Sequence, residues 1–257
     1  MNLIVKLFYS SIIKKIMDNT FKEHLINYFN KSSYHFHISY RLENLLNNEY
    51  DNINHPNSQF FSMNRLYISD WTNESEEGWE LPFSSNVFTK TDKENYVIEM
   101  NNLKSRQNLL NYSQTFEAFQ GFLKDCITQN NNQIKRENLY KNNIILLNLK
   151  NEIGETFKNK SNRNNKNYKF EPLFDILVQL RHSITHSNGL VEKNKIIKDE
   201  YSNKLFRHMM PEAKFEKSNI ILEMPFSSFK RNMTILNEFA FQIYKIFSIE
   251  NDFDYKL

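Results

Sequence analysis

The stretch KENYVIEMNNLKSRQNLLNYSQTFEAFQGFLKDCITQ, residues 93–129, decides the fold. Its apolar residues recur at the three- and four-residue spacing of an α-helix, and no proline interrupts them. The apolar set is Leu103, Leu109, Leu110, Tyr112, Phe116, Phe119, Phe122 and Leu123. The spacing predicts one long helix that ends near Gln129, just before a run of three asparagines.

Three further segments toward the C-terminus show the same helical spacing. They predict helices over residues 138–158, 171–188 and 227–248. Pro172 suits the first turn of its helix, and Asn188-Gly189 suits the end because glycine readily adopts the left-handed conformation. Ser227 and Ser228 are the predicted N-caps of the last helix.

Between these helices the composition changes. The Asn/Lys-rich residues 159–168 predict a loop. Residues 190–194 and 215–224 predict short strands or extended segments around a connector that contains Pro211. The chain from residue 91 to residue 250 is therefore predicted to be a helical bundle with small extended insertions, which makes the fold class mostly α.

Residues 1–90 are predicted to be a flanking region of mixed α and β structure, with a role that the sequence does not reveal. Helical patterns cover residues 12–30 and 38–48. Residues 66–88 mix aromatic and β-branched side chains with a glycine and a proline, which predicts a hairpin or irregular strands.

Composition restricts the classes of function. Of the 257 residues, 40% are hydrophobic and 14% aromatic, enough to bury a core, which argues against global disorder. The 33 Lys+Arg against 30 Asp+Glu give a formal net charge of +3, so the strongly basic balance of proteins that hold long duplex DNA is absent. Any contact with nucleic acid is expected to be local.

The cysteine content and the hydropathy suggest where the protein acts. Cys126 is the single cysteine, which excludes an internal disulfide framework and favours a reducing, cytoplasmic location. No run reaches the roughly 18 apolar residues of a membrane span, so no membrane partner is expected. The apolar residues 1–17 are interrupted by Lys6, which predicts a helix rather than a signal peptide and leaves a membrane-surface anchor as the alternative.

A basic stretch precedes the helix predicted over 171–188. It consists of Lys158, Lys160, Arg163, Lys166 and Lys169, interleaved with asparagines. Two interpretations remain open, a solvated loop and a rim that guides phosphate groups.

The helix predicted over 171–188 combines an apolar stripe with a polar face. The stripe consists of Leu173, Leu177, Leu180 and Ile184, which fall within a narrow arc at about 100° per residue. The opposite face carries Asp175, Gln179, His182 and His186. Two histidines four residues apart are thus expected away from the core.

These histidines allow three interpretations. The first is a solvent-exposed polar face. The second is a zinc site, because histidines at i and i+4 can chelate the metal, although Asp175 is the one further ligand nearby and no Glu follows His182 as in metalloproteases. The third is metal-free acid–base chemistry, in which histidine carries a proton and Arg181 binds a phosphate.

The residues of this helix end also carry a family resemblance. The string RHSITHSNG, residues 181–189, resembles the Arg-x4-6-His signature of the HEPN superfamily (higher eukaryotes and prokaryotes nucleotide-binding domain). A polar residue after the arginine and an Asn-Gly turn after the histidine match further details of that pattern. Residues 112–125, YSQTFEAFQGFLKD, are similar to the long helix that precedes the motif, and the whole resemblance covers roughly residues 93–250.

The resemblance implies a metal-independent endoribonuclease without a cofactor, of the kind found among toxins and phage-defence effectors. Arg181 and His186 would be catalytic. His182 and Asn188 would be accessory. Glu117 lies in the helix expected to flank the motif, and it is expected to be an accessory residue, as a charged edge or an ion-pair partner of Arg181. RNA is the implied substrate, and an antitoxin or regulatory protein is a further implied partner.

Helix geometry bears on how the two catalytic residues could meet. Five residues along a regular helix turn by about 500°, so Arg181 and His186 are expected to point about 140° apart. Two copies packed about a two-fold axis would bring the Arg of one and the His of the other into a shared cleft, which is how HEPN dimers are generally built. A homodimer is therefore expected.

One departure and one alternative accompany this prediction. Toxins paired with nucleotidyltransferase antitoxins resemble an Arg-x4-His-x-Tyr pattern, but Asn188 occupies the tyrosine position here, so the resemblance does not extend to that mode of neutralisation. The alternative function is a non-catalytic HEPN-like module that binds a nucleotide or a protein partner through the same surface.

Overall fold

The structure is a computed structural model that describes residues 19–51, 66–68, 79–81, 93–161 and 168–257. The chain divides into two compact units, which we describe separately. The first combines the residues up to Arg41 with Lys104–Leu257, and the second is Leu42–Leu103. The N-terminal segment, predicted to be a helix, lies outside the described residues.

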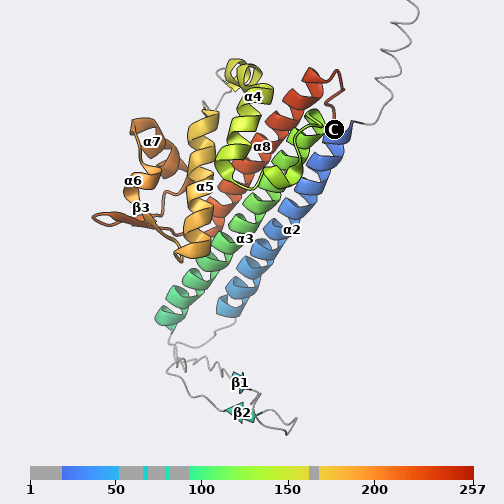
Figure 1. Ribbon diagram of the computed structural model, residues 1–257. Helices are drawn as coiled ribbons and strands as arrows, with labels where there is room; N and C mark the ends of the chain where they lie inside the picture. Colours follow the sequence, from blue (N-terminus) through green and yellow to red (C-terminus); the bar gives the residue numbers. More distant parts are fainter. Residues whose placement is uncertain (1–18, 52–65, 69–78, 82–92, 162–167) are drawn as a thin grey trace, which may run out of the picture. The chain divides into compact units, whose positions relative to one another are not determined.

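Most of the described chain is helical (Figure 1), which confirms the predicted mostly-α fold class. The main helices are α2 (Thr20–Asp51), α3 (Lys93–Asn130), α4 (Asn142–Ser161), α5 (Phe170–His186) and α8 (Phe226–Glu250). The short ones are the 3-10 helix η1 (Arg136–Asn138), α6 (Lys193–Ile196) and α7 (Glu200–Met209).

The predicted helices agree with the structure at α3, α5 and α8, and differ elsewhere. One continuous α2 replaces the two short helices predicted over 12–30 and 38–48, as far as that region is described. Helix α4 continues to Ser161, so the loop prediction is wrong for residues 159–161. Pro225, rather than Ser227 or Ser228, is the N-cap of α8.

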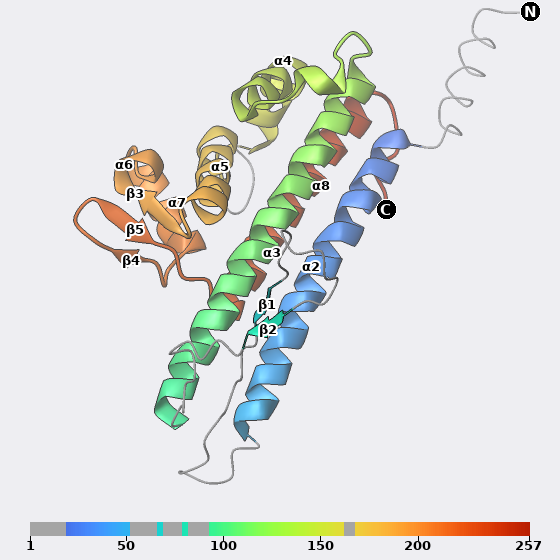
Figure 2. The same ribbon diagram turned by 60° about the horizontal axis from the view of Figure 1, so that its bottom comes forward.

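Aromatic side chains join the long helices of the first unit. Phe21 of α2 stacks on Phe247 of α8, with ring centroids 5.4 Å apart. Tyr28 of α2 and Phe239 of α8 both pack on Phe119 of α3, at 5.8 and 5.4 Å. The three helices run side by side in both ribbon views (Figures 1 and 2), and α2 therefore contributes to the main core although it comes from the predicted flank.

Two small antiparallel sheets accompany the helices. In the first unit, β3 (Leu190–Glu192), β5 (Asn219–Ile221) and β4 (Lys214–Phe215) pair in that order, which confirms the predicted extended segments. In the second unit, β1 (Leu66–Ile68) pairs with β2 (Trp79–Leu81), which confirms a predicted pair of short strands. The division of the chain into a flanking region, residues 1–90, and a helical domain, residues 91–250, stays a prediction.

Helix α5 ends in a turn that its last residues dictate. Asn188 and Gly189 both adopt positive φ, at 52° and 82°. The amides of Ser187 and Gly189 both donate to the carbonyl of Ser183, at 3.0 and 2.9 Å, and these bonds close the end of the helix. The predicted Asn-Gly stop is confirmed, and the chain turns directly into β3.

Helix α7 was not predicted. Asp199 caps it by accepting a hydrogen bond from the amide of Ser202 at 2.6 Å, while the Ser202 hydroxyl accepts from the amide of Asp199 at 2.9 Å. This reciprocal bonding is a capping box, and the amide of Ser202 lowers the pKa of the Asp199 carboxyl. The sequence Asp-x-x-Ser ahead of an apolar set was the signal for this helix.

Among the helices of the described ranges, none combines the length and the apolar character that a bilayer crossing requires.

We expect opposite effects from two glycine substitutions. Gly189→Ala should lower the free energy of unfolding by about 1 kcal/mol, because a side chain at φ 82° is strained even though the new Cβ would have ordinary contacts. Gly154→Ala, inside α4, should raise it by about 0.5–1 kcal/mol by improving helix propensity. Urea denaturation measures both, and a stabilising Gly189→Ala would contradict the left-handed turn.

The packing of α2 on the core can be tested with one buried and one exposed residue. Phe21→Ala should cost about 3–5 kcal/mol, because the ring is 1% exposed and stacks on Phe247. Ile26→Ala on the same helix should change stability by less than about 0.5 kcal/mol, because Ile26 is 44% exposed. Equal losses in denaturation experiments would show that this end of α2 is not part of the core.

Candidate active site at the end of helix α5

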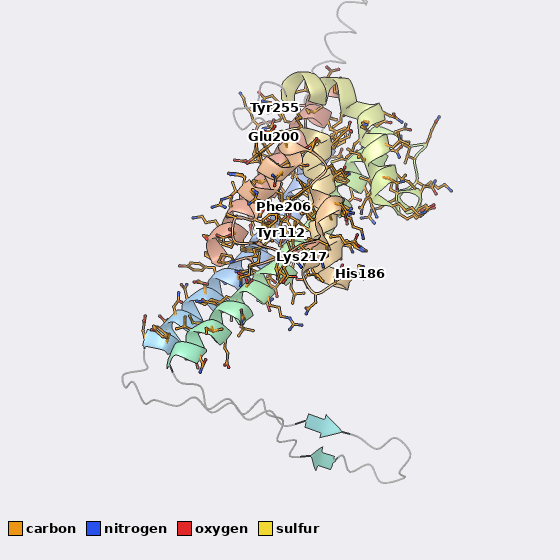
Figure 3. All side chains as sticks on the ribbon, turned by 90° about the vertical axis from the view of Figure 1, so that its left-hand side faces the viewer. Tyr112, His186, Glu200, Phe206, Lys217 and Tyr255 are labelled. Atoms are coloured by element: carbon orange, nitrogen blue, oxygen red, sulfur yellow. The ribbon has the colours of Figure 1, made fainter. Side chains whose placement is uncertain are left out.

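Helix α5 carries the predicted site residues on the face opposite its apolar stripe. The stripe is buried as predicted, at Leu173, Leu177, Leu180 and Ile184. His182, His186 and Asn188 are all exposed. Figure 3 shows His186 at the C-terminal end of α5, so this end presents two imidazoles and an amide to solvent.

Arg181 forms the ion pair that the sequence predicted. Its Nη2 lies 2.7 Å from Oε1 of Glu117 on α3. The two side chains are 30% and 50% exposed, respectively, so the ion pair adds little to stability. Its effect is to hold the guanidinium in one place, between α3 and α5.

Arg181 also has an unusual buried donor. Its Nε is shielded from solvent and has no hydrogen-bond partner in the described part of the chain. Buried donors are nearly always satisfied, and an exception is expected where a water, an ion or a catalytic role accounts for it. Because Nε is shielded, a ligand would meet the Nη groups of the guanidinium rather than Nε.

The two histidines lie against each other. The ring centroids of His182 and His186 are 4.8 Å apart and the rings are tilted by 46°. Successive turns of α5 produce this contact, because residues four apart share one face of a helix. The site thus offers two imidazoles side by side.

The neighbouring hydroxyls are already engaged. Ser183 donates to the carbonyl of Gln179 at 2.8 Å, and Thr185 donates to the carbonyl of Arg181 at 3.0 Å. These bonds to the preceding turn use the only hydrogen of each hydroxyl. Arg181 and the two histidines are therefore the groups of this helix end best placed for chemistry.

The zinc interpretation has no third ligand in what the structure describes. Asp175, the further ligand considered from the sequence, pairs with Lys198 through Oδ2 and Nζ at 2.9 Å. The described residues contain no group of three or more His, Cys, Asp or Glu side chains that could hold a metal ion.

Within one chain, Arg181 and His186 contact different neighbours. Arg181 reaches across to α3, whereas His186 packs on His182 along α5. Because α5 is helical from Phe170 to His186, the expected angle of about 140° between the two side chains is retained. No hydrogen bond or ion pair among the described residues joins them, so a second protomer remains the expected way to bring both to one phosphate.

Other residues noted in the sequence have simpler explanations. Cys126 is fully buried, and burial raises the pKa of its thiol, as befits a small core residue. His35 and His37 lie within the continuous helix α2, in the interval between the two helices predicted over 12–30 and 38–48. Of the basic stretch, Lys158 and Lys160 belong to α4, while Arg163 and Lys166 lie outside the described residues.

A groove between α7 and α8 is not predicted by the sequence patterns. It has a volume of about 870 Å³ and is lined mainly by residues of these two helices and by Tyr168, which precedes α5. The sequence predicts a connector where α7 lies, so it does not bring the side chains of α7 and α8 together. Recognising the Asp199 cap would have revealed the helix and one wall of the groove.

Comparisons of the chain with models of known protein families, with curated proteins and with solved structures find no match. A function for this site is therefore proposed from its geometry and its sequence motif.

A double-mutant cycle tests what the ion pair contributes. Arg181→Ala, Glu117→Ala and the double variant should give a coupling energy of about 0.2–1 kcal/mol in denaturation experiments, because both side chains are partly exposed. A coupling of several kcal/mol would mean that the pair is a structural element rather than a device that positions Arg181.

Proposed function

We propose that the protein is a metal-independent endoribonuclease of the HEPN type that acts as a homodimer, with Arg181 and His186 as catalytic residues. The observation that carries the proposal is the arrangement at the end of α5. There, Glu117 holds a guanidinium that is followed by two adjacent exposed imidazoles. The Arg-x4-His spacing and the Asn-Gly turn support the family resemblance in the same few residues.

These side chains match the requirements of RNA cleavage. The 2′-hydroxyl of RNA loses a proton to His186 and its oxygen attacks the adjacent phosphorus, while the bond from phosphorus to the 5′-oxygen breaks. The Arg181 guanidinium stabilises the negative charge that develops on the phosphoryl oxygens. The departing 5′-oxygen takes up a proton, so the reaction needs one base and one acid and leaves a cyclic phosphate.

A two-fold dimer would supply these groups. Packing the C-terminal ends of α5 from two protomers would place two copies each of Arg181 and His186 around one cleft. Arg181 of one copy then faces His186 of the other, which gives two equivalent sites in the dimer. In each site the imidazole takes the proton from the 2′-hydroxyl, and the imidazolium that results can give a proton to the departing 5′-oxygen. His182, Asn188 and Glu117 act as accessory residues that position these groups.

The proposed biological role is that of a toxin or phage-defence effector in the cytoplasm. A short-range site of this kind needs one phosphate rather than a long basic track, which agrees with the net charge of +3. An antitoxin or regulatory protein would then be needed to restrain the activity.

Cleavage assays with metal removed test the proposal. The full chain should cleave single-stranded RNA in EDTA, and Arg181→Ala and His186→Ala should each lower the rate by about 100-fold or more. His37→Ala, on the exposed surface of α2, is the matched control and should retain activity. Cleavage retained in both site variants, or a strict requirement for a divalent metal, would refute the assignment.

Mixed dimers test the shared cleft. When Arg181→Ala and His186→Ala protomers are combined, half of the dimers are mixed and each has one intact site, so about a quarter of the wild-type rate should return. No recovery, with mixed dimers verified by mass spectrometry, would place both residues of each site in one protomer. Absence of cleavage in every arm would favour the non-catalytic alternative.

A further inference from the structure

The groove between α7 and α8 has a consistent chemical character that the proposed active site does not use. Four basic side chains line it, Lys204 and His208 from α7 and Lys230 and Arg231 from α8. None of the lining residues in the described part of the chain has a carboxylate. The groove is therefore suited to an anionic ligand.

The basic side chains keep capacity for such a ligand. Arg231 donates from Nη1 to the carbonyl of His208 at 3.1 Å, a bond that positions its guanidinium without neutralising it. Lys204 pairs with Glu200 at 2.6 Å, but both side chains are largely exposed, so water competes with this pair. Lys230, the residue before Arg231 on α8, is exposed.

Two tyrosines add aromatic surface to the same groove. Tyr201 is fixed by its neighbour Lys169, whose amide donates to the Tyr201 hydroxyl at 2.7 Å and whose Nζ lies 4.8 Å from the ring centroid. The ring of Tyr168 lies 6.3 Å from that of His208. Buried Leu205 and Ile235 complete an apolar wall.

We propose that this groove binds a nucleotide, with the phosphate held by Lys230 and Arg231 and the base packed against Tyr201. Guanidinium and ammonium groups recognise phosphate, and tyrosine rings stack on bases. The volume of about 870 Å³ lies within the range of small-molecule sites. The nucleotide is either a free nucleoside phosphate or one unit of an RNA strand.

This site is distinct from the end of α5 and does not depend on RNA cleavage. Tyr168 lies just before the N-terminus of α5, whereas His186 lies at its C-terminus, and Figure 3 shows His186 well apart from Glu200 at the start of α7. The residues that would bind a ligand in the groove are therefore different from those that the proposed nuclease chemistry uses.

Calorimetric titration of the full chain tests the proposal with four probes, namely ATP, UTP, inorganic tripolyphosphate and a single-stranded 2′-O-methyl RNA. The RNA lacks the attacking hydroxyl, so its binding is independent of cleavage. The variant Lys230→Gln/Arg231→Gln should weaken binding about tenfold or more. The control Arg41→Gln/Lys217→Gln removes the same charges at exposed positions outside the groove and should bind normally.

A second pair of variants tests recognition of the base. Tyr201→Leu should weaken nucleotide binding about tenfold and leave tripolyphosphate binding unchanged, whereas Tyr201→Phe should bind like wild type because it retains the ring. Circular dichroism confirms that each variant is folded.

The outcomes separate the two sources of the nucleotide. Binding of ATP or UTP that is lost in Lys230→Gln/Arg231→Gln would identify a free nucleotide. Binding of RNA alone, lost in the same variant, would identify a unit of an RNA strand. The proposal is overturned if neither class binds, if tripolyphosphate binds as tightly as the nucleotides and the RNA, or if the groove variant binds like its control.

Discussion

The packing of Phe119 is the contact on which the first unit depends. Its ring meets Tyr28 of α2 and Phe239 of α8, and Phe116, three residues earlier on α3, meets Phe174 of α5 with ring centroids 6.2 Å apart. Each of these rings buries a large apolar surface and fixes the distance between two helix axes. Helix α3 therefore determines where α2, α8 and α5 lie.

This packing also sets the geometry of the candidate active site. Phe116 and Glu117 are consecutive on α3, while Phe174 and Arg181 lie seven residues apart on α5, about two helical turns. The two helices that meet through their phenyl rings thus also bring the carboxylate to the guanidinium at 2.7 Å. An exposed ion pair is too weak to position a helix, so the core places the pair and the pair orients the side chain.

The sequence predicted the parts of the fold that depend on local patterns. The spacing of apolar residues identified α3, α5 and α8, and the Asn-Gly dipeptide identified the end of α5, because both signals act within a few residues. It also anticipated the pair of Glu117 and Arg181. The division of α2 into two helices was wrong because its mixed polar composition hides a continuous helix that packing stabilises. The groove was missed because it needs two helices from distant segments, one of them only ten residues long.

The two sites lie at opposite ends of one rigid element. The 17 residues of α5 span about 25 Å, with Tyr168 of the groove just before the helix and His186 at its end. Substitutions at residues more than about 10 Å apart that share no partners have additive effects on the free energy of unfolding. Variants in the groove and variants at the helix end can therefore be interpreted independently. Coupling between them would require a ligand that binds two states of the chain with different affinity. The buried stripe of α5 and its contacts with α3 and α8 oppose such a change, because moving the helix would disrupt the packing around Phe119.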